Sequence, residues 1–229
     1  MRTSIVECRR CPRLRAFCER IAVEKRAAFR SETYWARPVP GFGDPRARIV
    51  IVGLAPAAHG ANRTGRMFTG DGAGGSSEFL MTALHANGLA NHPDSERADD
   101  GLELRDTWML AAARCAPPDN KPTPEELDNC YGHLRAEIAS LPNARVYVAL
   151  GRIAFDACLR LVGEHSPLPR PRPVFAHSAV FSQGRPPHLI ASYHPSRQNT
   201  QTGKLTSTML REVFKRALSL ADEGPGPMA

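Results

Sequence analysis

RIVIVGL, at residues 48–54, is a short apolar run rich in β-branched side chains. Runs of this length and composition are typical of a strand that is buried on both faces of a sheet. The loop that follows, residues 55–75, is long and rich in glycine and polar residues. Long irregular loops inside compact domains usually carry function. The stretch therefore predicts a buried strand that leads directly into a functional loop.

Three further segments have the character of buried strands: TWMLAA at 107–112, RVYVAL at 145–150 and HLIASY at 188–193. Helical patterns alternate with them, within the first forty residues and at 76–88, from 123 onward, at 153–162 and at 205–221. Strands that alternate with helices predict an α/β fold, in which helices cover both faces of a central, mostly parallel sheet of four strands. We expect one domain over residues 1–229, with a disordered tail at 224–229.

Three polar loops each follow a predicted strand, at 55–75, 115–121 and 194–206. In open α/β sheets, ligands bind beyond the carboxyl ends of the strands. We therefore expect these loops to converge at one edge of the domain and to form a single site there.

Composition narrows the class of protein. The chain has 229 residues and a hydrophobic share of 42%, which suits one globular domain. Its longest apolar run is about seven residues, against the roughly 20 that span a bilayer, and no secretory signal is apparent. We expect a soluble cytoplasmic protein without membrane contact. Thirty Lys and Arg against 23 Asp and Glu leave a net charge of +7, which favours a polyanionic partner such as nucleic acid.

Four of the six cysteines have a spacing that indicates a metal site. Cys8 and Cys11 form a C-x-x-C pair, while Cys115 and Cys130 flank a proline-rich turn and the start of a helix. Four thiolates of this kind suit either zinc or a [4Fe–4S] cluster, and the spacing alone does not choose between them. The other two cysteines, Cys18 and Cys158, lie in apolar helical patterns and are expected to be buried core residues.

Two motifs together carry a family resemblance. GLAPAAHGANRTGRMFTGDGAG at 53–74 and HPSRQNTQTGKLT at 194–206 closely resemble family 5 uracil-DNA glycosylases, as does CAPPDNKPTPEELDNC at 115–130 with the preceding C-x-x-C. The resemblance extends over roughly residues 8–210. It implies a three-layer α/β/α sandwich and a [4Fe–4S] cluster on Cys8, Cys11, Cys115 and Cys130.

The resemblance also implies an activity: cleavage of the N-glycosidic bond of uracil, and of damaged bases such as hypoxanthine and ethenocytosine, in double-stranded DNA. Many relatives in the wider superfamily have an acidic residue or Asn where this chain has Ala55-Pro56-Ala57. They also have a uracil-reading Asn where Ala111 stands here. These differences are typical of family 5 and predict relaxed selectivity for uracil.

The reaction itself suggests roles for individual residues. A base in a duplex must be flipped out before it is reached, and departure of the base leaves positive charge on the sugar and negative charge on the base. We expect Phe68 to be the stacking platform, with a core position under the loop as the alternative. His194 is expected to donate to the departing base. Asp71 suits water positioning or sugar-cation stabilisation, and Asn120 suits a base edge, although both are common turn residues.

The remaining candidates surround these residues in the two motifs. Asn62 and His59 are candidates for base binding, and the backbone amides of Ala55, Ala57 and Ala58 are candidate oxyanion donors. Arg197 is expected either to fill the space left by the flipped base or to bind a phosphate. The expected DNA contacts, which follow from positive charge or from their place in the second motif, are Arg63, Arg66, Ser196, Arg197, Gln198 and Lys204.

Two other functions remain open from the residues alone. The first is a non-catalytic nucleic-acid-binding module stabilised by its metal, which explains the charge and the cysteines but neither motif. The second is a metal-dependent hydrolase that uses His59, Asp71 and His194, but no metal-ligand spacing supports it. For the glycosylase we expect a monomer.

Overall fold

The computed structural model describes residues 2–70, 72 and 74–223. Asp71 and the tail 224–229, for which the sequence predicts a role and disorder respectively, lie outside the described residues. The described residues contain one sheet of six strands in the order β1-β3-β2-β4-β6-β5. The strands are β1 (Phe42–Gly43), β2 (Ile49–Gly53), β3 (Thr107–Ala111), β4 (Val146–Leu150), β5 (Val180–Phe181) and β6 (His188–Ser192).

The four inner strands β3, β2, β4 and β6 are parallel, as the sequence predicts, and their bounds agree with the expected segments to within one residue. The register pairs Val52 with Leu110 and Val148 with Ile190. The outer strands β1 and β5 are antiparallel and were not predicted. The sheet therefore has six strands instead of the expected four. The two additional strands were not predicted because a strand of two residues is too short to show a period-two pattern in the sequence.

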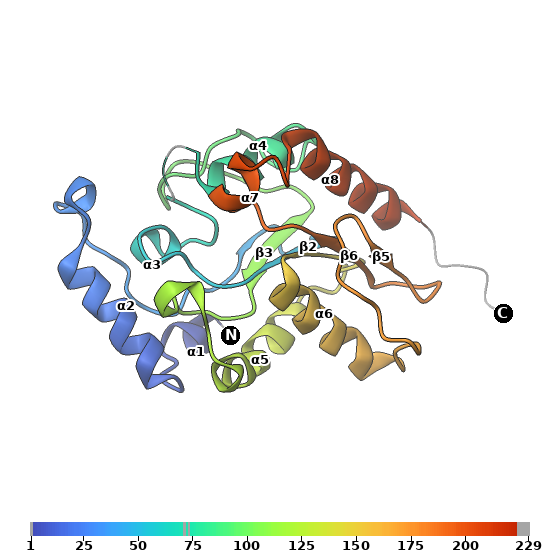
Figure 1. The fold of residues 1–229 in the computed structure, drawn as a ribbon, viewed down its shortest axis with the longest axis horizontal. Helices are drawn as coiled ribbons and strands as arrows, with labels where there is room; N and C mark the ends of the chain where they lie inside the picture. Colours follow the sequence, from blue (N-terminus) through green and yellow to red (C-terminus); the bar gives the residue numbers. More distant parts are fainter. Residues whose placement is uncertain (1, 71, 73, 224–229) are drawn as a thin grey trace.

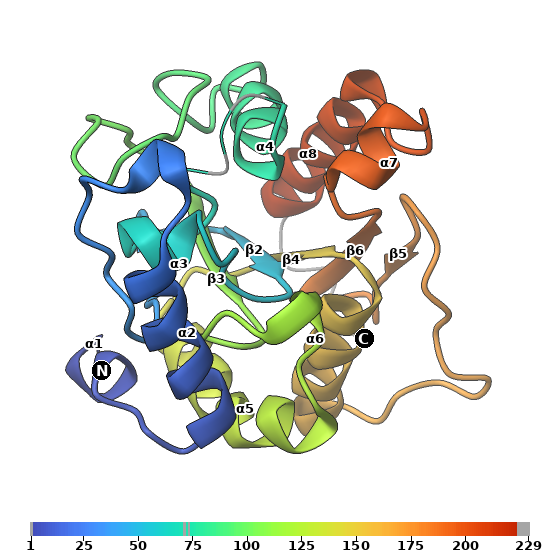
Figure 2. The same cartoon turned by 60° about the vertical axis from the view of Figure 1, so that its left-hand side comes forward.

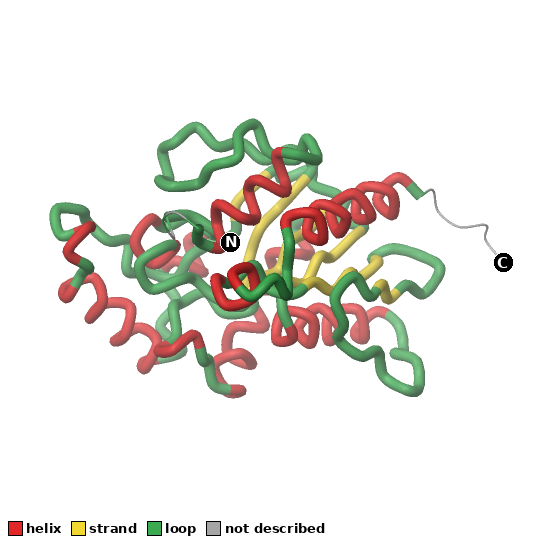
Figure 3. Tube along the Cα trace, turned by 45° about the horizontal axis from the view of Figure 1, so that its top comes forward, coloured by secondary structure: helices red, strands yellow, loops and turns green. Residues whose placement is uncertain are grey.

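Alternate side chains of the sheet build two cores. Ile49 and Ile51 of β2 face one layer and Val50 and Val52 face the other, and all four are fully buried. Helices α4 (Ser76–His85) and α8 (Ser207–Asp222) cover the first face, and helices α5 (Pro124–Ala139) and α6 (Arg152–His165) cover the second. Figures 1 and 3 show the sheet between these two helical layers. The predicted three-layer α/β/α sandwich is therefore confirmed.

The helix that begins after Thr123 shows why its start was predictable. The Thr123 hydroxyl accepts the Glu126 backbone N–H at 3.2 Å, and the Glu126 carboxylate accepts the Thr123 N–H at 2.8 Å. This capping box satisfies two amides that a helix otherwise leaves without partners. Pro124 opens the helix at a position where no amide hydrogen is needed. No helix in the described part of the chain is long and apolar enough to cross a membrane.

Several short helices lie outside the two layers. They occur at the N-terminus and in the loops at the carboxyl edge of the sheet: α1 (Arg2–Val6), α2 (Pro12–Glu24), η1 (Ala27–Phe29), α3 (Ala61–Thr64), η2 (Pro118–Asn120) and α7 (Arg197–Gln201). Helices α3 and α7 lie in segments that the sequence predicts as loops. Figure 2 shows α2 and α3 apart from α7 and α8, with the sheet between the two groups.

Candidate active site

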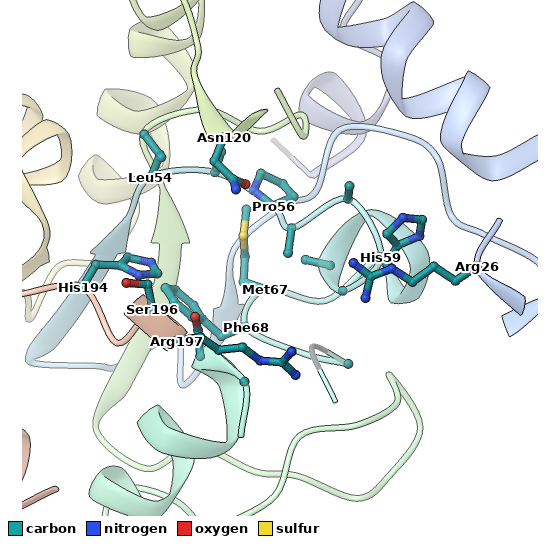
Figure 4. Close-up of a pocket in the computed structure, with 18 residues that line it drawn as sticks. Arg26, Leu54, Pro56, His59, Met67, Phe68, Asn120, His194, Ser196 and Arg197 are labelled. Atoms are coloured by element: carbon teal, nitrogen blue, oxygen red, sulfur yellow. The ribbon is translucent and has the colours of Figure 1, made fainter. Parts of the chain in front are cut away.

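The three polar loops converge at the carboxyl edge of the sheet, as predicted, and enclose a cavity of about 510 Å³. Its walls come from the loop after β2, from η2 after β3 and from the segment after β6, together with Arg26 after α2 (Figure 4). A volume of this size is ordinary for a small-molecule site. The predicted residues that line it are Ala55, Ala57, His59, Phe68, Asn120, His194, Ser196 and Arg197.

Phe68 lines this cavity with its ring against the end of β2. Its backbone has φ +48°, an uncommon conformation for a side chain of this size. A Cβ at Gly53 would lie 2.6 Å from the Phe68 Cζ atom, so the last residue of β2 must be glycine for the ring to lie there. The Phe68 ring packs against the hydrophobic core and also borders the cavity, so a place in the core does not exclude contact with a ligand in the cavity.

His194 follows β6 as a half-buried residue and lines the same end of the cavity as Phe68. Burial lowers the pKa of His194 from 6.5 to about 4, so the ring is neutral at physiological pH. Its backbone is held by the Asn199 side-chain amide, which donates to the His194 carbonyl at 2.8 Å. Within the described chain neither ring nitrogen has a hydrogen-bond partner. The imidazole is thus held in place by its backbone while its nitrogens stay available.

Donors and acceptors for a ligand come from two other segments. Asn120 ends η2 with φ +55°, and its side-chain amide has no partner in the described residues. The backbone amides of Ala55 and Ala57 likewise have no acceptor there. Pro56, between them, has no amide hydrogen to offer. Asn120 and the two alanines all line the cavity, where these groups are free to bind a polar ligand.

Three residues predicted to touch base or DNA are buried instead. Asn62 is 1% exposed, and its side-chain amide donates to the carbonyls of Cys18 and Ala58. Arg63 and Arg66 are each 6% exposed. The side chains of all three bind other parts of the fold, while the expected base contact of Asn62 and the expected phosphate contacts of the two arginines stay predictions.

The partners of the two arginines explain their burial. The Arg63 guanidinium pairs with Glu32, donates to the Gly70 carbonyl at 3.0 Å and lies over the Phe29 ring. The Arg66 guanidinium pairs with Asp100 at 2.6 Å and donates to Thr69 at 2.9 Å. Buried charges are tolerated where they are paired and hydrogen-bonded. Both arginines therefore tie the loop after β2 to distant segments.

The second motif remains at the surface. Ser196 accepts the Asn199 backbone N–H as the N-cap of α7, and both Ser196 and Arg197 line the cavity. Gln198 and Lys204 are exposed without lining it, and the Lys204 ammonium lies 4.8 Å from the centre of the Tyr193 ring. Positions such as these remain accessible to a large ligand that covers the cavity mouth.

The four predicted metal-ligating cysteines come together at a second, much smaller cavity of about 20 Å³. Cys8 and Cys11 precede α2, Cys115 follows β3 and Cys130 lies in α5. The Arg114 backbone N–H donates to the Cys130 sulfur at 3.2 Å. Within the described residues no three His, Cys, Asp or Glu side chains are arranged to hold a single metal ion. Cys18 and Cys158 are fully buried, as predicted.

Sequence reasoning missed several residues that line the large cavity. Arg26 comes from the segment after α2, far from either motif, and no local pattern marks it. The others are mostly small or apolar residues of the loop after β2 and of the start of α4: Leu54, Gly60, Ala61, Met67, Gly70, Gly75 and Ser76. Their place between the motif residues was the one available signal.

Comparisons with known proteins agree with this geometry. Residues 40–218 match the model of the uracil DNA glycosylase superfamily. The type-5 uracil-DNA glycosylase of Thermus thermophilus is 53% identical over 95% of both chains. That of Mycobacterium bovis is 50% identical over 93% of this chain and 78% of its own, and that of Pyrobaculum aerophilum 45% identical over 96% and 91%. The family resemblance of the two motifs is thereby confirmed, and the chain belongs to the uracil-DNA glycosylase superfamily and, within it, to the type-5 family.

Proposed function

We propose that this protein removes uracil from double-stranded DNA by hydrolysing the N-glycosidic bond, which leaves an abasic site. The observation that carries the proposal is the joint placement of Phe68 and His194 in one cavity at the carboxyl edge of the sheet. A stacking face and a free hydrogen-bond donor are what a flipped base needs. Membership of the type-5 family supports the same reaction.

Each group has a role in this reaction. Phe68 stacks on the flipped base without reading its edge. The neutral His194 imidazole donates an N–H to the base oxygen, where negative charge develops as the bond breaks. The amides of Ala55 and Ala57 supplement this donation, and Asn120 binds a further polar edge of the base. Stabilisation of the leaving base lowers the barrier because these donors are in place before the reaction begins.

We assign the remaining role in the reaction to Asp71 because of its position in the motif at 53–74. Its carboxylate positions the attacking water or stabilises the cationic sugar. Glycosidic bond cleavage of this kind passes through an oxocarbenium-like state, which a nearby carboxylate favours.

We propose that the enzyme also accepts hypoxanthine and ethenocytosine. The base-facing positions Ala55 and Ala57 have small side chains, so selectivity cannot come from a side-chain hydrogen bond at either of them. Ala111, at the end of β3, also has no side-chain amide that could form hydrogen bonds specific to uracil. A cavity of about 510 Å³ with few reading groups suits bases larger than uracil.

We propose that Cys8, Cys11, Cys115 and Cys130 hold a [4Fe–4S] cluster. Four thiolates are the usual ligand set of such a cluster, and each binds a different iron, so they need not converge on one point as they do around a single ion. When bound, the cluster supplies a covalent link between the N-terminal segment, β3 and α5.

Buried donors around the four cysteines support an anionic group at this site. Arg114 is 1% exposed, and its Nε and Nη1 atoms have no acceptor among the described residues, while Nη2 pairs with Glu137. Within the same part of the chain, Nη1 of Arg15 and Nε2 of His133 are also buried without a hydrogen-bond partner. All three side chains line the small cavity with the cysteines. Orphaned donors of this kind call for an explanation, and sulfurs that carry negative charge provide one.

We further propose that the enzyme acts as a monomer that binds duplex DNA through the second motif. Residues of one chain suffice to line the whole cavity, so no second copy is needed to complete it. Arg197, Gln198 and Lys204 lie on or beside the cavity mouth, where Arg197 either fills the space of the flipped base or binds a phosphate.

The decisive experiment is incubation of the purified protein with a duplex that contains one uracil, in the presence of a divalent-metal chelator. Release of free uracil and formation of an abasic site are expected. Binding without base release favours the non-catalytic binding module, and release that requires an added metal favours the hydrolase. A parallel panel of duplexes with hypoxanthine or ethenocytosine tests the wider substrate range.

A further inference from the structure

The large cavity has two chemically different ends. Figure 4 shows His194, Ser196 and Phe68 at one end and Arg26 and His59 at the other. Among the described lining residues the charged ones are Arg26 and Arg197, both cationic, and none is acidic. A cavity with this distribution favours a ligand that carries negative charge away from the base end.

Arg26 is exposed between α2 and η1, and its guanidinium has neither an ion pair nor a hydrogen-bond partner in the part of the chain that the structure describes. The basic residues of the preceding helix α2 differ from Arg26 in this respect. Arg13, Arg15 and Arg20 are paired with Glu126, Glu19 and Glu24 respectively. Arg26 thus presents an uncompensated charge to the cavity.

His59 stands beside this charge in a defined orientation. Its Nδ1 lies 3.0 Å from the hydroxyl of Tyr34, which is 7% exposed, and the two rings meet edge to face. Where the Tyr34 hydroxyl donates its proton to Nδ1, the imidazole hydrogen of His59 is on Nε2. Burial, then the charges of Arg26 and Arg63, lower the pKa of His59 and keep the ring neutral. In that tautomer His59, a residue of the cavity wall, offers its Nε2–H as a donor to a ligand.

We infer that Arg26 and His59 form a phosphate site, which binds the DNA backbone next to the nucleotide whose base enters the cavity. The inference rests on the proposed function and assigns His59 to the backbone and not to the base. A guanidinium offers paired donors to phosphate oxygens, and the neighbouring Nε2–H adds a third. The backbone then crosses the cavity mouth between Arg26 and the α7 segment, while the base reaches Phe68 and His194.

Salt dependence of DNA binding tests this site apart from catalysis. A phosphate contact releases counterions, so each one adds about 0.9 to the slope of log affinity against log salt. We expect Arg26→Gln to weaken binding to a duplex with a stable abasic-site analogue and to reduce that slope by about 0.9. Arg26→Lys should restore most of the slope, and His59→Gln should weaken binding with little change in it.

Arg20→Gln is the matched control, because it removes the same charge from a residue of α2 that does not line the cavity and that is paired with Glu24. Its slope should equal that of the wild type. An unchanged slope for Arg26→Gln, or an equal loss in the control, overturns the inference. Uracil release by the wild type, measured in parallel, reports on the proposed function alone, because binding to the analogue requires no cleavage.

Discussion

The ring of Phe68 lies at 29° to the imidazole of His194, and the ring centres are 6.4 Å apart. The two rings come from segments more than a hundred residues apart in the sequence, the loop after β2 and the loop after β6. Parallel strands bring both to the same edge of the sheet. In the proposed function, a base that stacks on Phe68 would lie within reach of His194, so that stacking and hydrogen-bond donation would act on one ligand.

Removal of the His194 donor should slow base release without loss of DNA binding. Loss of one preorganised donor to a developing anion commonly lowers the rate about 100–1000-fold. We expect this decrease for His194→Ala in single-turnover uracil release, with near-normal affinity for abasic DNA. Cleavage at the wild-type rate would show that the histidine has only a structural role.

Gly53→Ala should displace Phe68 although it lies outside the cavity lining. The added Cβ would lie 2.6 Å from the Phe68 Cζ, closer than such atoms approach, so the ring must move. Since stacking does not discriminate between bases, uracil and hypoxanthine release should fall by the same factor in single-turnover assays. Gly163→Ala is the control, because its Cβ would meet Leu168 at an ordinary 3.4 Å. Selective loss on one base would argue against stacking.

Arg66→Ala should destabilise the fold instead of weakening DNA binding. Burial raises the pKa of Asp100, but hydrogen bonds from Arg66 and from the amides of Leu102 and Arg97 outweigh it and lower the pKa to about 2. Without Arg66 this carboxylate is left charged and poorly paired. We expect the free energy of unfolding to fall by about 3 kcal/mol, the low end for breaking a buried pair. Denaturant unfolding measures it, and a stable variant with a reduced salt slope of DNA binding would restore the phosphate role.

Acid should destabilise the free enzyme already between pH 7 and pH 5. Burial lowers the pKa of His194 to about 4, and burial also lowers the pKa of His177 and His188. The unfolded chain, in which histidine has its ordinary pKa of about 6.5, then binds more protons than the folded one, so stability is lost as the pH falls below that value. His194→Gln should reduce this loss in urea unfolding at the two pH values. An equal loss in variant and wild type would mean that His194 titrates normally.

The cysteine site predicts a defined metal content. Protein prepared anaerobically with sufficient iron should contain about four irons per chain. Cys115→Ser should lower this content, while Cys158→Ser should not, because Cys158 is fully buried in α6, away from the other cysteines. Stoichiometric zinc in place of iron would contradict the cluster. Cys18 is a poorer control because its side chain contacts Cys115.

Much of the architecture was already determined by local sequence. The β-branched run of β2 and the capping box at Thr123 specify their elements through neighbours within a few residues, so both appear where predicted. Once the strands alternate with helices, a parallel sheet follows, and its carboxyl edge gathers the two motifs. The place of His194 and Phe68 at one site was predictable for this reason.

Only the tertiary structure decided which polar side chains face the cavity. The sequence suggests that Arg63 and Arg66 lie at the surface, yet both are buried and form ion pairs with Glu32 and Asp100 respectively. Arg26 lies in neither motif, yet it lines the cavity without an ion pair among the described residues. A buried guanidinium needs a compensating charge, and for Arg63 and Arg66 the compensating carboxylates lie about 30 positions away along the chain. The sequence specifies elements through near neighbours, whereas the direction of a charged side chain depends on partners that only the folded chain brings close.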